Sequence, residues 1–300
     1  MIPKEILEKV HRIEITTNRL VTDIFAGQYH SVFKGRGMEF DEVREYQMGD
    51  DIRTIDWNVS ARTGRLHIKK FVEERELTVM VMVDASRSCR FASVHELKSK
   101  LAAELAAVLA FAAIRNNDKV GLIIFTDQIE LFIPPRKGTR HVLRVIREVL
   151  YFKPKGRSTD LVQALEYLSR IATRKAVTFV ISDFFETLNS PSGEPSFKKA
   201  LRITNKRHDV IAVTLNDPRE KSLPDCGLLE LEDLETGKKI VVDTGSARVR
   251  ERYQKDALKR LEERDRLFRS LNVDHIDIST HIPYTKALIE FFARRRKRRI

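Results

Sequence analysis

Four short, almost wholly apolar runs constrain the fold of this 300-residue chain more than any other feature. They are LTVMVMVD (77–84), KVGLIIF (119–125), AVTFVISD (176–183) and DVIAVTLND (209–217). Stretches with helical patterning separate them, and unbroken apolar strands are typical of a parallel sheet that helices cover on both faces. The sequence therefore predicts an α/β protein with a doubly wound, mostly parallel, Rossmann-like sheet.

The intervening segments predict the remaining elements. Helices are expected at about 94–115, 140–150, 160–172, 196–206, 247–271 and from 284 towards the C-terminus. The run IELFIPP (129–135) predicts an edge strand, because Pro134 and Pro135 lack the backbone N–H of a central strand. A last strand is expected at HIDIST (275–280), and LLELEDLETGKKIVVDT predicts a β-hairpin insertion near 227–243, with its turn at Thr236-Gly237.

The chain is expected to divide at the start of the first apolar run. Residues 1–76 would form a small N-terminal α+β segment with a helix at 3–25 and a strand at 66–71, and residues 77–300 would form the main domain with a basic C-terminal helix. The N-terminus lacks the apolar core of a signal peptide, and no run approaches the ~18 apolar residues of a membrane span. We therefore expect a cytoplasmic protein.

Composition excludes several classes of protein. Hydrophobic residues make up 42% and charged residues 33%, which is typical of a globular chain. The two cysteines, Cys89 and Cys226, have no disulfide or zinc-ligand spacing, so a reducing compartment is expected. Six positive charges at 294–299 supply half of the net charge of +12, and this run is interpreted as a solvated helix end or as a contact for RNA, anionic lipid or an acidic protein face. No aromatic platform favours nucleic acid.

Oxygen-bearing side chains follow three of the predicted strands or their loops. They are Asp84, Ser86 and Ser88 after the first run, Thr159 in GRSTDL, and Asp183 at the end of VTFVISD. Ligands of such sheets gather at the carboxyl ends of the strands, and Mg²⁺ or Mn²⁺ prefers oxygen ligands. The five residues are therefore candidate metal ligands. Helix capping and turn hydrogen bonds are the alternative explanation for Asp and Ser in such places.

The spacing D-x-S-x-S, with a Thr and an Asp from two later loops, resembles the metal-ion-dependent adhesion site (MIDAS) of the von Willebrand factor type A fold. The resemblance implies that Ser86, Ser88 and Thr159 are hydroxyl ligands and that Asp84 and Asp183 bind the cation directly or through water. It also implies an open coordination position for a carboxylate of a partner. Asp183 is followed by Phe184-Phe185, where many such domains carry Gly.

Three further stretches resemble the family called domain of unknown function 58. They are EYQMGDDIRTIDWNVSARTGRLHIKKFVEERE, LNDPREKSLP and ISTHIPYTKALIEFFARRR, which together span nearly the whole chain. Members are commonly encoded beside MoxR-type AAA+ ATPases, which implies a non-enzymatic adaptor role in chaperone-like assembly or stress tolerance. The chain has no Walker A loop, so ATP hydrolysis would belong to the partner.

Two residues beside the ligand positions, Arg87 and Phe184, are candidate partner-binding residues. The segment around Asp51, Arg53 and Trp57 is interpreted either as a docking surface or, preferably, as internal packing with Trp57 as its anchor. The enzyme alternative is a Mg²⁺-dependent phosphohydrolase that uses Asp84. Such enzymes usually place a second aspartate where this chain has Ser86, and no general base is evident, so a binding protein is favoured.

Overall fold

The structure is a computed structural model that describes residues 39–72, 76–91, 97–185, 193–233 and 237–298, together with Tyr29, Val32 and Ser93. By their contacts, residues 33–77 form one compact unit, and the other described residues form a second, larger one. The helix predicted at 3–25 lies outside the described residues. Tyr29 and Val32 belong to the larger unit, where the Tyr29 ring centroid lies 6.2 Å from that of Phe292.

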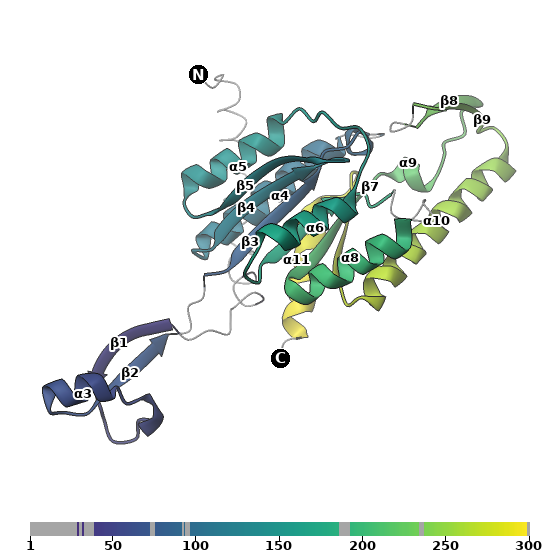
Figure 1. Ribbon diagram of the computed structural model, residues 1–300. Coiled ribbons are helices and arrows are strands. Elements are labelled where there is room, and N and C mark those ends of the chain that lie inside the picture. The colour runs from purple at the N-terminus through teal and green to yellow at the C-terminus, as the bar shows by residue number, and fades with distance from the viewer. Residues whose placement is uncertain are drawn as a thin grey trace. The chain divides into compact units, whose positions relative to one another are not determined.

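A six-stranded sheet forms the centre of the larger unit (Figure 1). Its strands are β3 (Thr78–Asp84), β4 (Lys119–Phe125), β5 (Ile129–Arg136), β6 (Val177–Ser182), β7 (Asp209–Asn216) and β10 (Asp274–Ser279). Their order is β10-β7-β6-β3-β4-β5, and every neighbouring pair is parallel except β4 and β5. The predicted mostly parallel sheet is confirmed, and so is the edge position of the proline-closed strand β5.

Helices flank this sheet. They are α4 (Lys98–Arg115), α5 (Thr139–Tyr151), α6 (Leu161–Ile171), α8 (Gly193–Arg207), the short α9 (Pro218–Lys221), α10 (Ala247–Ser270) and α11 (Tyr284–Lys297). Residues of α6, α8 and α10 share one buried cluster with Met80, Met82 and Val180 of the strands. Side chains alternate along a strand, so Val79, Val81 and Val83 point to the opposite face, where α4 contacts β3 and β4.

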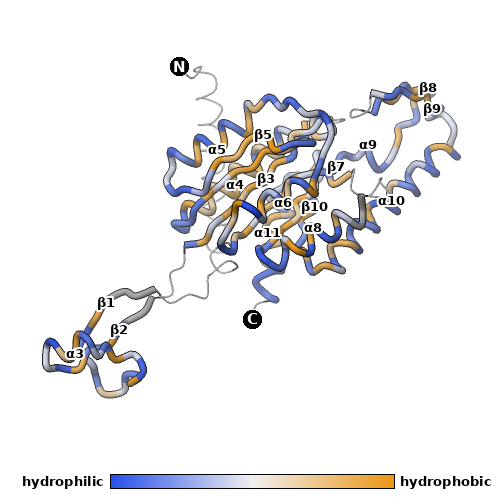
Figure 2. Tube along the Cα trace, in the orientation of Figure 1, coloured by the Kyte–Doolittle hydropathy of each residue, from blue (hydrophilic) through white to orange (hydrophobic). Residues whose placement is uncertain are grey.

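Burial explains why the strands carry unbroken apolar runs. Every residue of β6 is buried, and so is every residue of β3 and β4 after the first. Figure 2 shows this as hydrophobic colouring along the central strands, whereas hydrophilic residues dominate α10. Among the helices of the described residues, none combines the length and the apolar character needed to cross a membrane.

The hairpin insertion also forms as predicted. Strands β8 (Leu228–Glu232) and β9 (Lys239–Asp243) pair antiparallel, and Gly237 beside the turn adopts a positive φ of 70°. Three apolar residues of the hairpin, Leu228, Ile240 and Val241, are exposed. The hairpin is therefore a surface feature with little core of its own.

The smaller unit contains the strand predicted at 66–71 together with elements that the sequence pattern did not predict. Strand β1 (Glu39–Glu45) pairs antiparallel with β2 (His67–Val72), and a short 3₁₀ turn η2 (Ile52–Thr54) and helix α3 (Trp57–Thr63) lie between them. Asp56 caps α3 by accepting from the backbone N–H groups of Asn58 and Val59 at 3.0 and 3.3 Å. Charged residues break the apolar alternation here, so hydrophobic periodicity gave no signal for β1.

The structure revises the packing interpretation of this segment. Trp57 is 66% exposed, so its indole is not a buried anchor within the unit. Asp51 accepts from the backbone N–H of Arg53 at 2.9 Å as the cap of η2, so these two residues form a local cap and not a side-chain pair. The neighbouring Asp50 instead forms a two-pronged ion pair with Arg44, at 2.7 and 2.9 Å.

One arginine of the basic C-terminal run is structural. Arg295 of α11 is 7% exposed, contacts Asp209, and places its guanidinium 3.0 Å from Asp274. Arg298 lies 3.2 Å from Asp274 but remains mostly exposed. The run is therefore divided between an internal ion-pair network that holds α11 on the sheet and exposed charges at its end.

Candidate metal centre

The central strands β3 and β6 end side by side at the switch point of the sheet. The connection from β3 leads to β4 on one side, whereas β6 lies on the other side, so the crossovers diverge between β3 and β6. In open α/β sheets, ligands bind at the carboxyl ends of strands at such a point. Asp84 is the last residue of β3, and Asp183 directly follows Ser182 at the end of β6.

Asp84 lies at the centre of the candidate site and is 1% exposed. Its Oδ1 accepts from the backbone N–H of Ser86 at 2.9 Å, and its Oδ2 accepts from the hydroxyl of Ser182 at 2.6 Å. The hydroxyl of Thr159 lies 3.4 Å from the same Oδ2. Two segments far from Asp84 in the sequence therefore bring hydroxyl oxygens to its carboxylate, and its own loop supplies a backbone N–H.

The loop after β3 is held by its neighbours. The N–H of Ala85 donates to the carbonyl of Phe125, and the N–H of Arg87 donates to the carbonyl of Arg157, at 2.9 and 3.0 Å. The hydroxyls of Ser86 and Ser88 lie 3.0 Å apart. These contacts place two hydroxyl groups and Asp84 on one turn, beside the loop that carries Thr159.

Asp183 has a different environment, dominated by a buried lysine. Its Oδ1 accepts from the N–H of Phe185 at 3.1 Å, and its Oδ2 lies 3.3 Å from the ammonium of Lys98, which is fully buried. Lys98 also pairs with Glu220 of α9. Glu220 is in turn fixed by a capping box, in which it accepts from the N–H of Asp217 at 2.8 Å.

The carboxylates at the site outnumber its cations. Burial, reinforced by the nearby charge of Asp183, raises the pKa of Asp84 to about 6. Burial disfavours the Lys98 ammonium, but Asp183 and Glu220 outweigh that cost and raise its pKa. One lysine thus serves two carboxylates while Asp84 has hydroxyl and amide donors but no cation within ion-pair distance in the described chain.

The donor atoms fit a hard divalent cation. In the described part of the chain, no three His, Cys, Asp or Glu side chains gather in a way that could hold a metal ion. The predicted set of Asp84, Ser86, Ser88, Thr159 and Asp183 is of another kind, with two carboxylates and three hydroxyls as its oxygen donors. Such a set suits Mg²⁺ or Mn²⁺ and does not suit zinc, which prefers nitrogen and sulfur. The residues present therefore fit the cation that the sequence predicts.

The two candidate partner-binding residues differ in their surroundings. Arg87 is partly exposed on the loop after β3. Phe184 is 2% exposed, adopts a positive φ of 55°, and packs its ring edge-on against Phe268 with centroids 5.3 Å apart. Its ring therefore belongs to the core and is not available to a partner. The neighbouring Phe185, 42% exposed, presents the aromatic surface that the sequence assigned to Phe184.

Sequence reasoning missed three residues of the site: Ser182 as a partner of Asp84, and Lys98 with Glu220 as partners of Asp183. The sequence pattern gave no signal for Lys98, because the predicted helix begins at about residue 94 and the structure starts it at Lys98. Lys98 is the first residue of the long apolar helix α4, and a cation at a helix N-terminus is disfavoured by the helix dipole. The carboxylates of Asp183 and Glu220 offset that cost for Lys98.

Comparisons with known proteins give relatives without a described activity. An uncharacterized protein of Mycobacterium bovis is 28% identical over 289 residues, which cover 95% of this chain and 88% of that protein. An uncharacterized protein of Mycobacterium tuberculosis matches with the same values. Uncharacterized protein YeaD of Bacillus subtilis is 24% identical over 140 residues, covering 47% of this chain and 33% of its own length.

Solved structures show weaker likeness. The conserved hypothetical protein BatB from Bacteroides thetaiotaomicron aligns with 74% of this chain and 99% of its own, at 18% identity and a TM-score of 0.47. An aerotolerance-related membrane protein from Bacteroides fragilis aligns with 74% and 99%, at 17% identity and the same TM-score. The family model described as "Protein of unknown function DUF58" matches residues 42–263, most of the chain. This chain therefore belongs to the family of proteins of unknown function DUF58.

Proposed function

We propose that this protein is a non-enzymatic adaptor that binds a partner protein through a divalent cation. In this proposal Asp84, Ser86, Ser88, Thr159 and Asp183 hold Mg²⁺ or Mn²⁺ in a von Willebrand factor type A-like domain, in the manner of the MIDAS. The observation that carries the proposal is the meeting of hydroxyl and carboxylate oxygens from three separate segments around Asp84.

The charge balance supports the same proposal. A buried carboxylate without a cationic partner is costly, and the raised pKa of Asp84 expresses that cost. A divalent cation would offset the charges of Asp84 and Asp183 together. When bound, it would supply a Lewis-acidic position for a carboxylate of the partner protein. The five ligand residues would orient that cation, while Lys98 and Glu220 would hold Asp183 in place.

The family resemblance suggests the kind of partner. A MoxR-type AAA+ ATPase would supply the ATP hydrolysis, and this chain would present or recruit a client in chaperone-like assembly or stress tolerance. The absence of a Walker A loop from the sequence is consistent with that division of roles.

Thermal denaturation with and without millimolar Mg²⁺ or Mn²⁺ tests the metal site. Binding of a ligand to the folded state alone stabilises it by about 2.7 kcal/mol at one hundred times its dissociation constant, so the midpoint should rise. The rise should disappear in Asp84→Ala and persist in Asp127→Ala, an exposed carboxylate that follows the neighbouring strand β4. An unchanged response in Asp84→Ala would exclude the proposed site.

Affinity capture from native lysate tests the adaptor role. The tagged protein should retain a AAA+ ATPase in Mg²⁺, and the yield should fall with EDTA or with Asp183→Ala but not with Asp127→Ala. Retention that is indifferent to both treatments would show that the association does not depend on the cation site. Capture without any AAA+ ATPase would contradict the assigned partner.

A further inference from the structure

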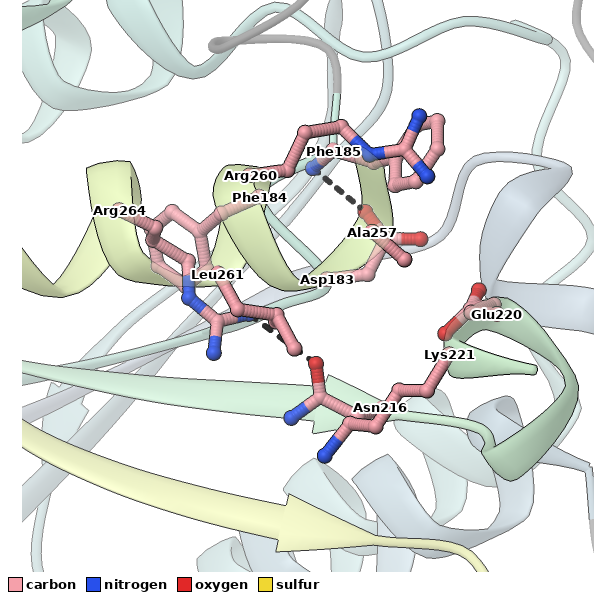
Figure 3. A pocket seen from close by; sticks show the side chains of 10 residues that line it. All are labelled: Asp183, Phe184, Phe185, Asn216, Glu220, Lys221, Ala257, Arg260, Leu261 and Arg264. Carbon is pink, nitrogen blue, oxygen red and sulfur yellow. Dashed lines mark hydrogen bonds between the residues drawn. The ribbon is translucent and has the colours of Figure 1, made fainter. Parts of the chain in front are cut away.

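A pocket lies beside Asp183, between the ends of β6 and β7 and the helices α9 and α10 (Figure 3). Ten residues line it: Asp183, Phe184, Phe185, Asn216, Glu220, Lys221, Ala257, Arg260, Leu261 and Arg264. Asp183 is also a proposed metal ligand, so the pocket and the candidate metal centre share a wall. None of the remaining nine residues is needed to bind the cation.

Part of the wall is apolar. The positive φ of Phe184 turns the chain so that its ring enters the core while the ring of Phe185 stays at the surface. Ala257 and Leu261 are one turn apart on α10 and lie on its pocket side, as Figure 3 shows. A ligand with an aliphatic stem could therefore lie between Phe185 and Leu261.

Two cations at the pocket have no anionic partner within ion-pair distance among the residues that the structure describes. The guanidinium of Arg260 stacks over the ring of Phe185, 5.0 Å from its centroid, and this holds the charge at the pocket wall. Neither Arg260 nor Lys221 forms an ion pair within 4.0 Å with any described residue.

A third cation, Arg264, is held at the bottom of the pocket and is only 4% exposed. It donates to the side-chain oxygen of Asn216 at 3.0 Å, and the nearest carboxylate oxygens, those of Asp265 and Asp277, are 3.8 Å away. Its Nε has no hydrogen-bond partner among the described residues. Burial outweighs these carboxylates and lowers the pKa of Arg264, so its charge is incompletely compensated.

The two acids of the lining supply only part of that compensation, because each of them also faces Lys98. Asp183 and Glu220 both form ion pairs with the buried Lys98. They do, however, set a limit on the ligand. Two fixed carboxylates at the rim repel a dianionic phosphate or a nucleic acid backbone more strongly than a single carboxylate. The pocket therefore favours a monoanion with an apolar stem.

We propose that this pocket is a second binding subsite, which takes the carboxylate of an acidic side chain of the partner polypeptide against Arg260, Lys221 and Arg264. Binding of a carboxylate by these three side chains does not require a cation at the candidate metal centre. The assignment of the ligand to a partner protein rests on the proposed function, because the pocket opens beside the proposed metal ligand Asp183. The aliphatic stem of the acidic residue packs on Phe185 and Leu261.

Two-dimensional ¹H–¹⁵N NMR of the full chain tests the proposal through the side-chain Nε–H signals of Arg260 and Arg264. The probe is N-acetyl-glutamate N-methylamide, and its uncharged counterpart is N-acetyl-glutamine N-methylamide. Both are titrated in EDTA and again in Mg²⁺. The glutamate probe should shift the Arg260 signal and the Phe185 amide in both buffers, and the glutamine probe should not.

A matched pair of variants separates binding at the pocket from general charge. Arg260→Gln should weaken binding of the glutamate probe at least tenfold without a change in thermal midpoint. Lys259→Gln, which removes an exposed neighbouring charge of α10, should bind as the wild type does. Equal shifts with the two probes, or wild-type binding by Arg260→Gln, would overturn the subsite.

The buffers and a competitor distinguish the remaining outcomes. Probe binding in EDTA, in a protein whose stability does not respond to Mg²⁺, would retain the subsite while the proposed metal function fails. A thermal midpoint that rises with Mg²⁺, without binding of the glutamate probe, would support the metal site and overturn the subsite. Free glutarate that binds at least tenfold more tightly than the blocked glutamate would overturn the assignment to a polypeptide and indicate a small dicarboxylate as the ligand.

Discussion

The ammonium of Lys98 lies 3.3 Å from a carboxylate oxygen of Asp183, and both side chains are almost completely removed from solvent. The two residues are 85 positions apart in the sequence, at the start of α4 and after the end of β6. A buried pair of this kind fixes the position of both groups, because either group alone would be an uncompensated buried charge. Asp183 is thereby held at the edge of the candidate metal centre.

Removal of the lysine should be costly. We expect Lys98→Met to lower the free energy of unfolding by about 3–5 kcal/mol, because Asp183 and Glu220 lose their shared cation. Urea denaturation measures this loss. Lys100→Met, at an exposed position of the same helix, should change stability by less than about 0.5 kcal/mol.

A second substitution tests whether the cost is electrostatic. In the double variant Lys98→Met with Asp183→Asn, the buried carboxylate is gone, so the loss should be smaller than the sum of the two single losses. Strictly additive losses would show that Lys98 and Asp183 do not interact.

The buried Asp84 should make stability depend on pH in the metal-free protein. Its pKa in the folded state, about 6, lies above the ordinary value of 3.8, so the folded state holds the proton more tightly than the unfolded state. Stability is then lost as pH rises from about 4 to 6 and stays low above that range. Asp84→Asn removes this loss and should be more stable than the wild type at pH 7 by up to about 3 kcal/mol.

The measurement is urea denaturation of both proteins in EDTA across this range of pH. The stability difference between Asp84→Asn and the wild type should be small near pH 4 and reach its full size above pH 6. A constant difference at all pH values would contradict the raised pKa. Added Mg²⁺ should stabilise the wild type alone.

We expect the hydroxyl of Ser182 to contribute to the stability of the folded protein, although Ser182 is not one of the proposed ligands. It donates to Asp84 at 2.6 Å and accepts from the N–H of Phe184 at 3.1 Å, and the side chain is fully buried. Ser182→Ala leaves both partners without this contact and should cost about 1–3 kcal/mol in thermal or urea denaturation. Ser169→Ala, which removes a partly buried hydroxyl on α6, is the control. Equal effects of the two changes would show that Ser182 has no special role.

The basic run of α11 should separate into structural and surface charges. Arg295→Met breaks the ion pairs with Asp209 and Asp274 and should destabilise the protein by about 3 kcal/mol or more. Arg296→Met removes an exposed charge and should leave stability within about 0.5 kcal/mol of the wild type. Sedimentation with anionic vesicles measures the surface role, and any binding by the run should weaken in Arg296→Met.

The two cysteines should react at very different rates. Burial raises the pKa of Cys89, and the charges of Asp84 and Asp183 raise it further, so its thiol is both shielded and protonated. Cys226 is exposed. An aromatic disulfide reagent should therefore titrate one thiol in the native protein and two after unfolding. Cys226→Ser should remove the fast reaction, and rapid labelling of Cys89 in that variant would contradict its burial.

Much of the fold could be predicted because residue patterns within single strands and helices indicate it. The apolar runs that became β3, β4, β6 and β7 need only their own composition to indicate a covered parallel sheet. The prolines at the end of β5 likewise restrict it to an edge. The small unit at 33–77 was less predictable, since β1 and α3 mix charged and apolar residues without a clear period.

Some features of the candidate site could likewise be predicted from the sequence, and others could not. Local sequence patterns predicted which oxygen-bearing side chains follow the strands, because strand ends and the D-x-S-x-S spacing are local features. The strand order, which local patterns do not contain, places β3 beside β6, so that Ser182 donates to Asp84, and helix packing brings Lys98 to Asp183. The tertiary structure also decided that Phe184 turns inward and Phe185 outward. These relationships join residues far apart in the chain, and they depend on strand order, helix packing and the cost of unpaired buried charge, which no local pattern records.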